Sequence, residues 1–116
     1  MSVALFTHPD MINHRPGAGH PERPERLQAV LDALDAAGLS RDRHAATEAA
    51  VADLERLHPA AHVARVLAAA PVEGLAALDA DTLLSPGSVR AGRLAAGAVI
   101  DAVRAVARGD TARAFA

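Results

Sequence analysis

Histidines are the side chains in this sequence that most suggest chemistry, and five of the six fall into two spaced groups: His8, His14 and His20, then His58 and His62. The second pair has the four-residue spacing with which a helix face can bind zinc. Pro59 separates the pair, however, and favours a helix boundary there. No carboxylate is obviously placed as a third ligand. We therefore interpret these histidines as solvated or capping side chains, and we expect this chain to bind no metal.

A charged, proline-rich stretch, HRPGAGHPERPERL, begins at residue 14 and follows the first apolar run. Its polar and stiffening residues include His20, Pro21, Glu22, Arg23 and Arg26. Prolines restrict the backbone, so the stretch predicts a rigid loop. Two interpretations fit these residues: a solvated connection between two elements, or one wall of a substrate pocket.

A third polar group is the acidic stretch LDADT, which contains Asp79 and Asp81. Carboxylates in a loop can accept N–H bonds from a ligand and attract a cationic one. Aspartate is also a normal choice in turns and helix caps, so the residues alone allow both interpretations.

Length and composition limit the classes of protein that this sequence can represent. Its 116 residues fit one domain, and 51% are hydrophobic, but alanine dominates and only two residues are aromatic, which predicts a shallow core. A net charge of −2 argues against nucleic-acid binding. The absence of cysteine excludes disulfides and thiolate metal sites. The N-terminus has neither a charged leader nor a long apolar run, so we expect a soluble cytoplasmic protein without a membrane partner.

The elements that must position these groups alternate between strands and helices. We expect strands at 3–6 and 112–116, helices at 24–37, 60–70 and 89–107, and irregular loops at 7–23 and 71–87. Residues 45–50 suit either a short strand or a connection, Asp53 is a candidate cap of a single turn, and Ser85 or Ser88 is expected to start the last long helix.

The helix at 89–107 carries a predicted buried stripe of mostly small residues, with arginines facing out. The stripe comprises Ala91, Leu94, Ala95, Ala98, Val99, Ala102, Val103 and Val106, and the outward arginines are Arg90, Arg93, Arg104 and Arg108. Strands separated by helices favour an α/β fold with a parallel sheet. The sequence stops within its last predicted strand, so we expect the sheet to be incomplete and the stability marginal.

Three stretches in this order, GHPERPERL, LDADTLLSPGS and RAGRLAAGAVIDAVRAVARGDTARAFA, resemble the N-terminal part of the histone deacetylase family. The similar branch comprises bacterial class II-like deacetylases and acetylpolyamine amidohydrolases. The resemblance implies an open parallel-sheet α/β fold of the arginase/deacetylase type, with residues 1–116 as the N-terminal portion of one domain whose catalytic remainder is absent.

The resemblance also implies a chemistry. Family members hydrolyse acetyl-lysine or acetylpolyamine amides with a zinc ion held by two aspartates and a histidine, and a histidine pair transfers protons. The family's Arg-Pro-Pro-Gly-His-His motif would follow the segment DTARAFA, so no catalytic or zinc-binding residue is expected in this chain. We therefore expect the chain alone to be inactive.

Residue roles follow from the same resemblance. His20, Pro21, Glu22 and Arg23 match the channel wall, Arg26 matches an arginine at the inner end of the channel, and either Asp79 or Asp81 matches a rim aspartate. His62 stands where a tyrosine is common. The implied partners are an acetylated lysine peptide or an acetylpolyamine, and a homo-oligomer is allowed. The alternatives are a non-catalytic truncated product and a small helical interaction module.

Overall fold

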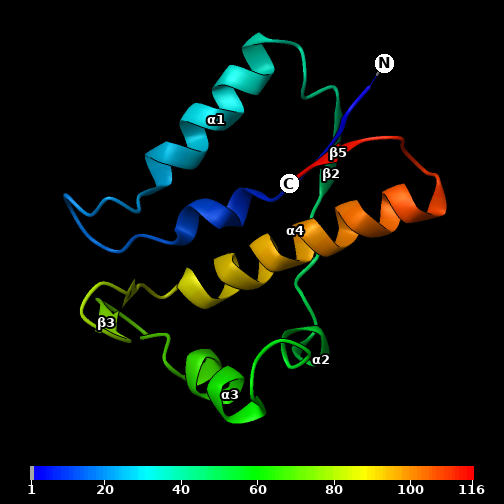
Figure 1. Ribbon diagram of the computed structural model, residues 1–116. Coiled ribbons are helices and arrows are strands. Elements are labelled where there is room, and N and C mark those ends of the chain that lie inside the picture. Colours follow the sequence, from blue (N-terminus) through cyan, green and yellow to red (C-terminus); the bar gives the residue numbers. More distant parts are fainter. Residues whose placement is uncertain (1) are drawn as a thin grey trace.

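A small parallel sheet forms the centre of the fold in the computed structural model, which describes residues 2–116. Its strands are β1 (Ala4–Thr7), β2 (Asp42–Ala45) and β5 (Ala114–Phe115), in the order β2-β1-β5. Both neighbours run parallel to β1, with Ala4 opposite both Asp42 and Ala114 (Figure 1). The predicted α/β class with a parallel sheet is confirmed.

All four residues of β1 are buried, as expected for the central strand of a parallel sheet. The apolar run Ala4-Leu5-Phe6 therefore folds as predicted, with its strand ending one residue later than expected. The predicted C-terminal strand is also present, although only two of its residues pair with β1.

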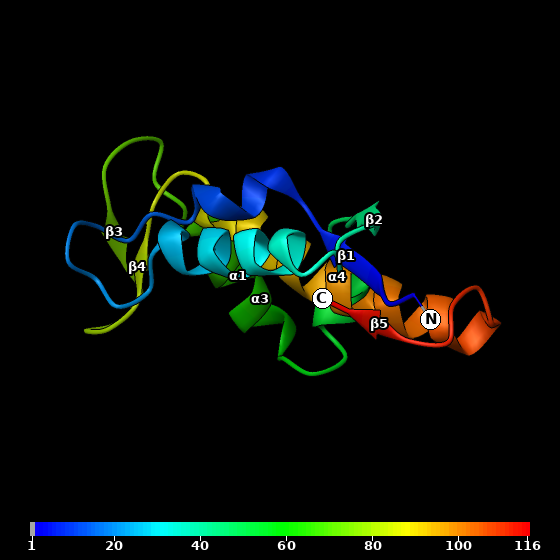
Figure 2. The same cartoon turned by 90° about the horizontal axis from the view of Figure 1, so that it is seen from above.

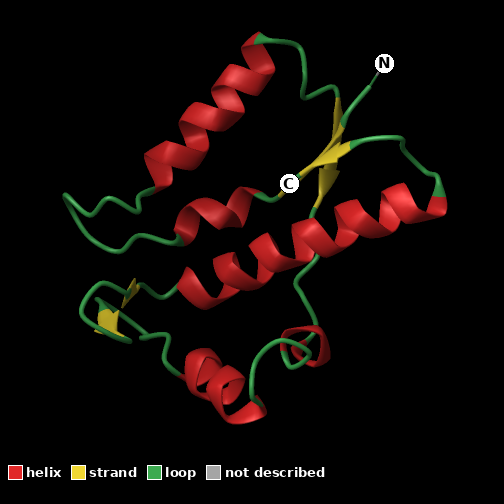
Figure 3. Cartoon of the chain, viewed as in Figure 1, coloured by secondary structure: helices red, strands yellow, loops and turns green. Residues whose placement is uncertain are grey.

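The remaining elements are helices and a short hairpin, and the hairpin lies away from the sheet (Figure 3). They are the 3₁₀ helix η1 (Pro9–Asn13), α1 (Pro24–Ala36), α2 (Val51–Leu54), α3 (Ala60–Ala68), the hairpin strands β3 (Ala76–Ala77) and β4 (Leu83–Leu84), and α4 (Ser88–Arg108). The long helix α4 contacts η1, β1 and β5, whereas α1 contacts η1. Among the described residues, no helix is long and apolar enough to cross a membrane.

Helix α1 has the ends that its sequence predicts. Pro24 occupies the start of the helix, where a missing N–H is harmless. Gly38, just after the helix, adopts a φ of +69°. The N–H of Leu39 donates a hydrogen bond to the carbonyl of Leu34 at 2.9 Å, which ends the helix. No residue of α1 is fully buried, because the helix packs on η1 and does not lie flat on the strands.

The core lies between β1 and α4 and is built from small side chains. Its buried cluster comprises Ala4, Phe6, Ala46, Ala98, Ala102 and Ala105. Alanines let α4 approach the sheet closely, and Gly97 lets the backbone of residues 47–49 cross the helix. The shallow core that the composition predicts is therefore present.

Several predicted details of α4 are wrong. Four residues of the predicted buried stripe are exposed: Ala95, Val99, Val103 and Val106. The predicted stripe is wider than the side of the helix that the three strands cover. Arg93 does not face out; its guanidinium donates to the carbonyl of Ala49 at 3.0 Å.

Helix α4 begins at Ser88, one of the two serines that we expected at its start, but the cap of the helix differs from the prediction. Gly87 occupies the N-cap position without a side-chain cap, so neither Ser85 nor Ser88 caps the helix. Both serines instead bind the loop that follows β1, as described below.

Elements within the predicted loops form another difference. Residues 9–13 form η1, and residues 76–84 contain the β3–β4 hairpin, because both are short enough to fit between the prolines and glycines that break longer elements. Strand β2 lies at 42–45, so the 45–50 segment is a connection. Asp53 lies inside α2, whose N-cap is Ala50, and so does not cap it.

Candidate functional site

The loop after β1 leaves the carboxyl end of the central strand, which is the sheet edge where open α/β folds bind ligands. Its first turn is η1. His8 caps the start of η1, because its Nδ1 atom accepts the backbone N–H of Asp10 at 3.1 Å. Residues 14–23, here called the proline loop, then run across the end of the molecule to α1.

Two buried serines hold the start of the proline loop against α4. Ser85 Oγ donates to the carbonyl of Asn13 at 2.9 Å and accepts the backbone N–H of Arg15 at 3.0 Å. Ser88 Oγ lies 2.7 Å from His14 Nδ1 and accepts the backbone N–H of Ser85 at 2.7 Å. Buried hydroxyls without such partners would destabilise the fold, so this network fixes the path of the loop.

Close backbone packing adds to this restraint. Pro16 is among the most deeply buried side chains of the protein. A Cβ atom at Gly87 would lie 2.6 Å from the Cβ atom of Asn13, and one at Gly17 would lie 3.3 Å from Leu75 Cδ1. The proline loop therefore lies against both the start of α4 and the segment that leads into β3.

The predicted wall residues occupy the outer part of this loop. His20 Nδ1 accepts the backbone N–H of Glu22 at 3.0 Å, which closes a local turn. Arg26, in the first turn of α1, donates to Glu22 Oε1 at 2.6 Å, and both side chains are 62% exposed. An ion pair this exposed contributes little stability, so the guanidinium remains accessible to a ligand.

A pocket of about 360 Å³ lies between η1, the proline loop and α1. Its lining comprises Met11, His14, Glu22, Arg23, Pro24, Arg26, Leu27 and Val30. The pocket thus combines apolar side chains, an arginine–carboxylate pair and a histidine whose Nδ1 is held by Ser88. Such a lining can hold an aliphatic group and a polar group of one ligand.

The β3–β4 hairpin carries the predicted rim aspartates. Asp79 Oδ1 accepts the backbone N–H of Asp81 at 2.9 Å, while Leu78 N–H donates to the carbonyl of Thr82 at 2.9 Å. The hydrogen bond from the Asp81 backbone, followed by that from the Thr82 hydroxyl, lowers the pKa of the Asp79 carboxyl below its usual value. Asp79 therefore shapes the turn, whereas we find no hydrogen bond or ion pair from the Asp81 carboxylate to a described residue.

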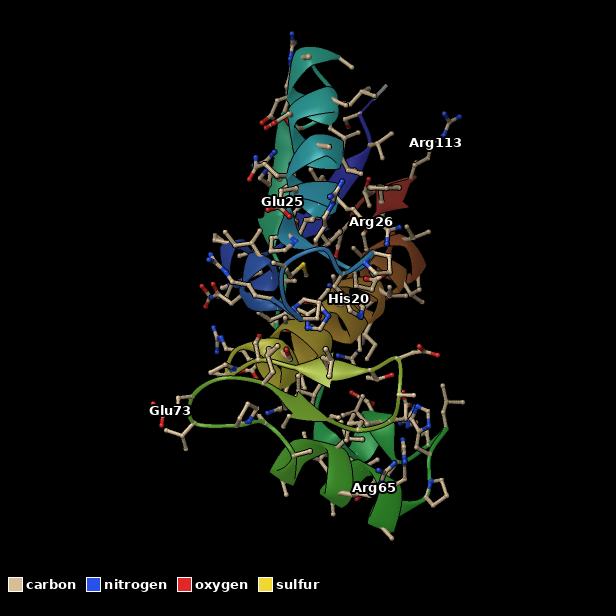
Figure 4. All side chains as sticks on the ribbon, turned by 90° about the vertical axis from the view of Figure 1, so that its left-hand side faces the viewer. His20, Glu25, Arg26, Arg65, Glu73 and Arg113 are labelled. Atoms are coloured by element: carbon tan, nitrogen blue, oxygen red, sulfur yellow. The ribbon has the colours of Figure 1, made fainter. Side chains whose placement is uncertain are left out.

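The structure brings the two predicted site segments to the same end of the molecule, where the proline loop and the hairpin lie side by side (Figure 2). Figure 4 shows His20 on the face of this end near the hairpin strands, whereas Arg26 lies farther from them, at the start of α1. Sequence reasoning missed the serines that hold this end together. The two serines three residues apart are the signal, but their partners lie about 70 residues away along the chain.

The fit of these residues to a metal ion is poor. Within residues 2–116, no three His, Asp or Glu side chains gather closely enough to hold a metal. The rings of His58 and His62 lie 5.4 Å apart, and a guanidinium nitrogen of Arg65 lies 3.3 Å from His62 Nδ1. The positive charge of Arg65 beside His62 would repel a metal cation, so we assign the two histidines no metal-binding role.

Comparison with known proteins identifies a family and similar solved structures. The family described as "Histone deacetylase domain" matches residues 20–116. The solved structure of the HDA15 HD domain is similar to this chain with a TM-score of 0.88 and 30% sequence identity. The similarity covers 98% of this chain and 34% of that one, so the chain spans about a third of the length of that structure. No curated protein matches.

Proposed function

Because the chain belongs to the histone deacetylase family, we propose that it supplies the channel wall and the rim loops of a deacetylase. The substrates that we propose are amides of acetyl-lysine or of an acetylated polyamine. The observation that supports this most directly is the meeting of the proline loop and the hairpin at the carboxyl edge of the parallel sheet. Two segments of the family motif, far apart in sequence, are held there by one pair of buried serines.

In this proposal the proline loop acts as a rigid wall. Its two anchored backbone groups and the buried Pro16 limit its motion, so a substrate that enters beside it loses little binding energy to ordering the protein. The apolar part of the pocket, from Met11, Leu27 and Val30, would contact the aliphatic part of the substrate.

Arg26 would act at the polar side of the same pocket. Its guanidinium already binds one carboxylate, that of Glu22, in an exposed pair that a ligand can open at little cost. The planar guanidinium can donate to a carbonyl or to a carboxylate product. His20, Pro21 and Arg23 would shape the wall around it.

The rim aspartate would bind the outer part of the substrate. A carboxylate there can accept backbone N–H bonds of a peptide and attract a cationic polyamine. We propose Asp81 for direct contact and Asp79 for positioning, because Asp79 Oδ1 is occupied by the turn that presents Asp81.

Zinc polarises the amide carbonyl in the family, but the described residues do not fit a zinc site, and we assign no metal-dependent step to this chain. We propose that the chain alone does not hydrolyse acetyl-lysine peptides or acetylpolyamines. Chelator-sensitive turnover by the purified chain would contradict this part of the proposal.

A chimera provides the positive test. This chain would replace the corresponding segment of an active family member, and deacetylation of an acetyl-lysine peptide and of an acetylpolyamine would be measured. We expect activity in the chimera, and Arg26→Ala should lower kcat/KM by roughly 10- to 100-fold, because the loss of a charged hydrogen bond costs ~1.4–2.7 kcal/mol.

Arg56→Ala is the matched control, because the Arg56 side chain is 80% exposed and does not line the pocket. A folded but inactive chimera would overturn the proposed function. Equal effects of Arg26→Ala and Arg56→Ala would remove the role assigned to Arg26.

A further inference from the structure

A pocket of about 280 Å³, here called the α3–α4 pocket, lies between α2, α3 and the first turns of α4. Six branched aliphatic side chains form most of its lining: Leu54, Val63, Val66, Leu67, Leu84 and Val89. Only Val63 and Leu84 among these six are fully buried, so the other four still expose apolar surface. Gly92 leaves further space, because no heavy atom lies within 4 Å of a Cβ atom built there.

The polar groups at the edge of the α3–α4 pocket are hydrogen-bond donors. His58 and His62 line the pocket, and no aspartate or glutamate belongs to its described lining. A guanidinium nitrogen of Arg65 lies 3.3 Å from His62 Nδ1. A guanidinium can only donate, so Nδ1 accepts, and a neutral His62 ring carries its proton on Nε2, where it can donate to a ligand.

Two arginines lie near this pocket, and only one of them has a charge that is not already paired. Arg93 lines the pocket, but its guanidinium binds the Ala49 carbonyl at 3.0 Å and the Glu48 carboxylate at 3.3 Å. Arg65 binds the ring of His62 and forms no ion pair among residues 2–116. Figure 4 shows Arg65 on α3, on the far side of the hairpin from His20. A positive charge without a paired carboxylate therefore lies beside an apolar pocket.

We propose that the α3–α4 pocket binds a medium-chain aliphatic carboxylate, with its alkyl chain on the aliphatic lining and its carboxylate on Arg65 and His62. The planar guanidinium suits the two oxygens of a carboxylate. The pocket volume lies just below the ~300–1,000 Å³ of pockets for drug-sized ligands, which fits one alkyl chain. The site is separate from the proposed deacetylase function, because this pocket and the one beside the proline loop share no lining residue.

Other ligands fit this pocket less well. A cationic amphiphile would place its charge beside Arg65, and the described lining offers no carboxylate to offset the repulsion. An apolar peptide segment would bury its own N–H and C=O groups against side chains that cannot pair with them.

The test titrates this full chain with octanoate in isothermal titration calorimetry, and hydrogen exchange locates the bound ligand. We expect saturable one-to-one binding, with slower amide exchange in α3 and in the first turns of α4. Acetate should bind at least about 100-fold more weakly, because it lacks the methylene groups that the pocket buries. Octylamine should show no saturable binding, because its charge has the wrong sign.

Two variants address the two halves of the site. Gly92→Leu places a side chain in the open space and should abolish binding while circular dichroism shows an unchanged helix content. Arg65→Gln should weaken octanoate binding about 10-fold, because a charge-assisted hydrogen bond is lost. Arg56→Gln is the matched control, since Arg56 is 80% exposed and does not line the pocket.

Several results would overturn this proposal. They are the absence of saturable octanoate binding to the parent chain, equal binding of octylamine, and equal effects of Arg65→Gln and Arg56→Gln. Undiminished binding to a folded Gly92→Leu variant would also overturn it, and if that variant does not fold, the ligand series and the arginine variants still decide. Loss of binding in Arg26→Ala, with exchange slowed in the proline loop instead of α3, would place the carboxylate in the pocket beside α1 and refute the α3–α4 site.

Discussion

Gly97 provides a sharp test of how α4 is packed. This glycine lies on the helix where the backbone of residues 47–49 crosses it. In Gly97→Ala, the new Cβ atom would lie 1.7 Å from the carbonyl oxygen of Thr47 and 2.9 Å from the backbone nitrogen of Ala49. Both atoms belong to the backbone, so no change of side-chain rotamer relieves the clash. The crossing segment must move away from the helix.

The cost follows from the bonds at this crossing. The Ala49 N–H donates to the carbonyl of Arg93 at 2.9 Å, and the Thr47 N–H donates to Asp101 at 2.8 Å. Overpacking costs ~1–3 kcal/mol, and loss of the two hydrogen bonds adds ~1 kcal/mol each. The better helix propensity of alanine returns ~1 kcal/mol. We therefore expect the free energy of unfolding to fall by about 2–4 kcal/mol.

Gly92→Ala is the control in the same helix, because no atom lies within 4 Å of a Cβ built at that glycine. It should raise the free energy of unfolding by up to ~1 kcal/mol. Urea denaturation followed by far-UV circular dichroism measures both variants, and hydrogen exchange at the Ala49 amide reports the crossing directly. Equal stability of the two alanine variants, with unchanged protection at Ala49, would refute this account of the packing.

Three further predictions concern the ends of the site. In Gly87→Ala, the new Cβ atom would lie 2.7 Å from the carbonyl oxygen of Asn13. Hydrogen exchange in residues 13–20 should therefore accelerate while β1 stays protected, and unchanged exchange would contradict this packing. Ser85→Ala should lower the free energy of unfolding by ~1–3 kcal/mol in denaturant titrations, since two backbone groups lose their partner. Folding lowers the pKa of the Asp79 carboxyl. The carboxylate therefore stabilises the hairpin above the unfolded pKa of 3.8, and this stability is lost as the pH falls through the lower folded pKa. Hairpin amide exchange, corrected for the intrinsic rate, should show this loss in the parent chain and in Asp81→Ala but not in Asp79→Ala.

The elements that sequence reasoning found are those with strong local signals. β1 is a continuous apolar run, α1 begins at a proline and ends at a glycine, and α4 ends at Gly109 with a φ of +80°. The strand β2 could not be found in this way, because Asp-Arg-His-Ala has no apolar alternation and three of its four residues are exposed. It is a strand because it pairs along the whole of β1.

The candidate site was only partly predictable for a similar reason. The resemblance to the family selected the proline loop and the acidic hairpin, and both lie at the same end of the molecule. Our proposal of Asp81 for substrate contact depends on the turn geometry, in which the Asp79 carboxylate accepts the N–H of Asp81. Ser85 and Ser88 act through contacts with residues 70 and 74 positions away along the chain, which no local pattern contains.

The rigidity of the proline loop therefore has two sources that act at different points. Proline restricts the backbone locally and explains why the sequence predicts a stiff loop. Stiffness alone does not place a loop, however, since a rigid segment can still pivot about its ends. The buried hydroxyls of Ser85 and Ser88 remove that pivot at residues 13–15, and Glu22 and Arg26 restrain the other end only weakly in their exposed pair. If Arg26 binds a ligand as we propose, that ligand would contact a loop whose backbone is fixed near α4 and less restrained near α1.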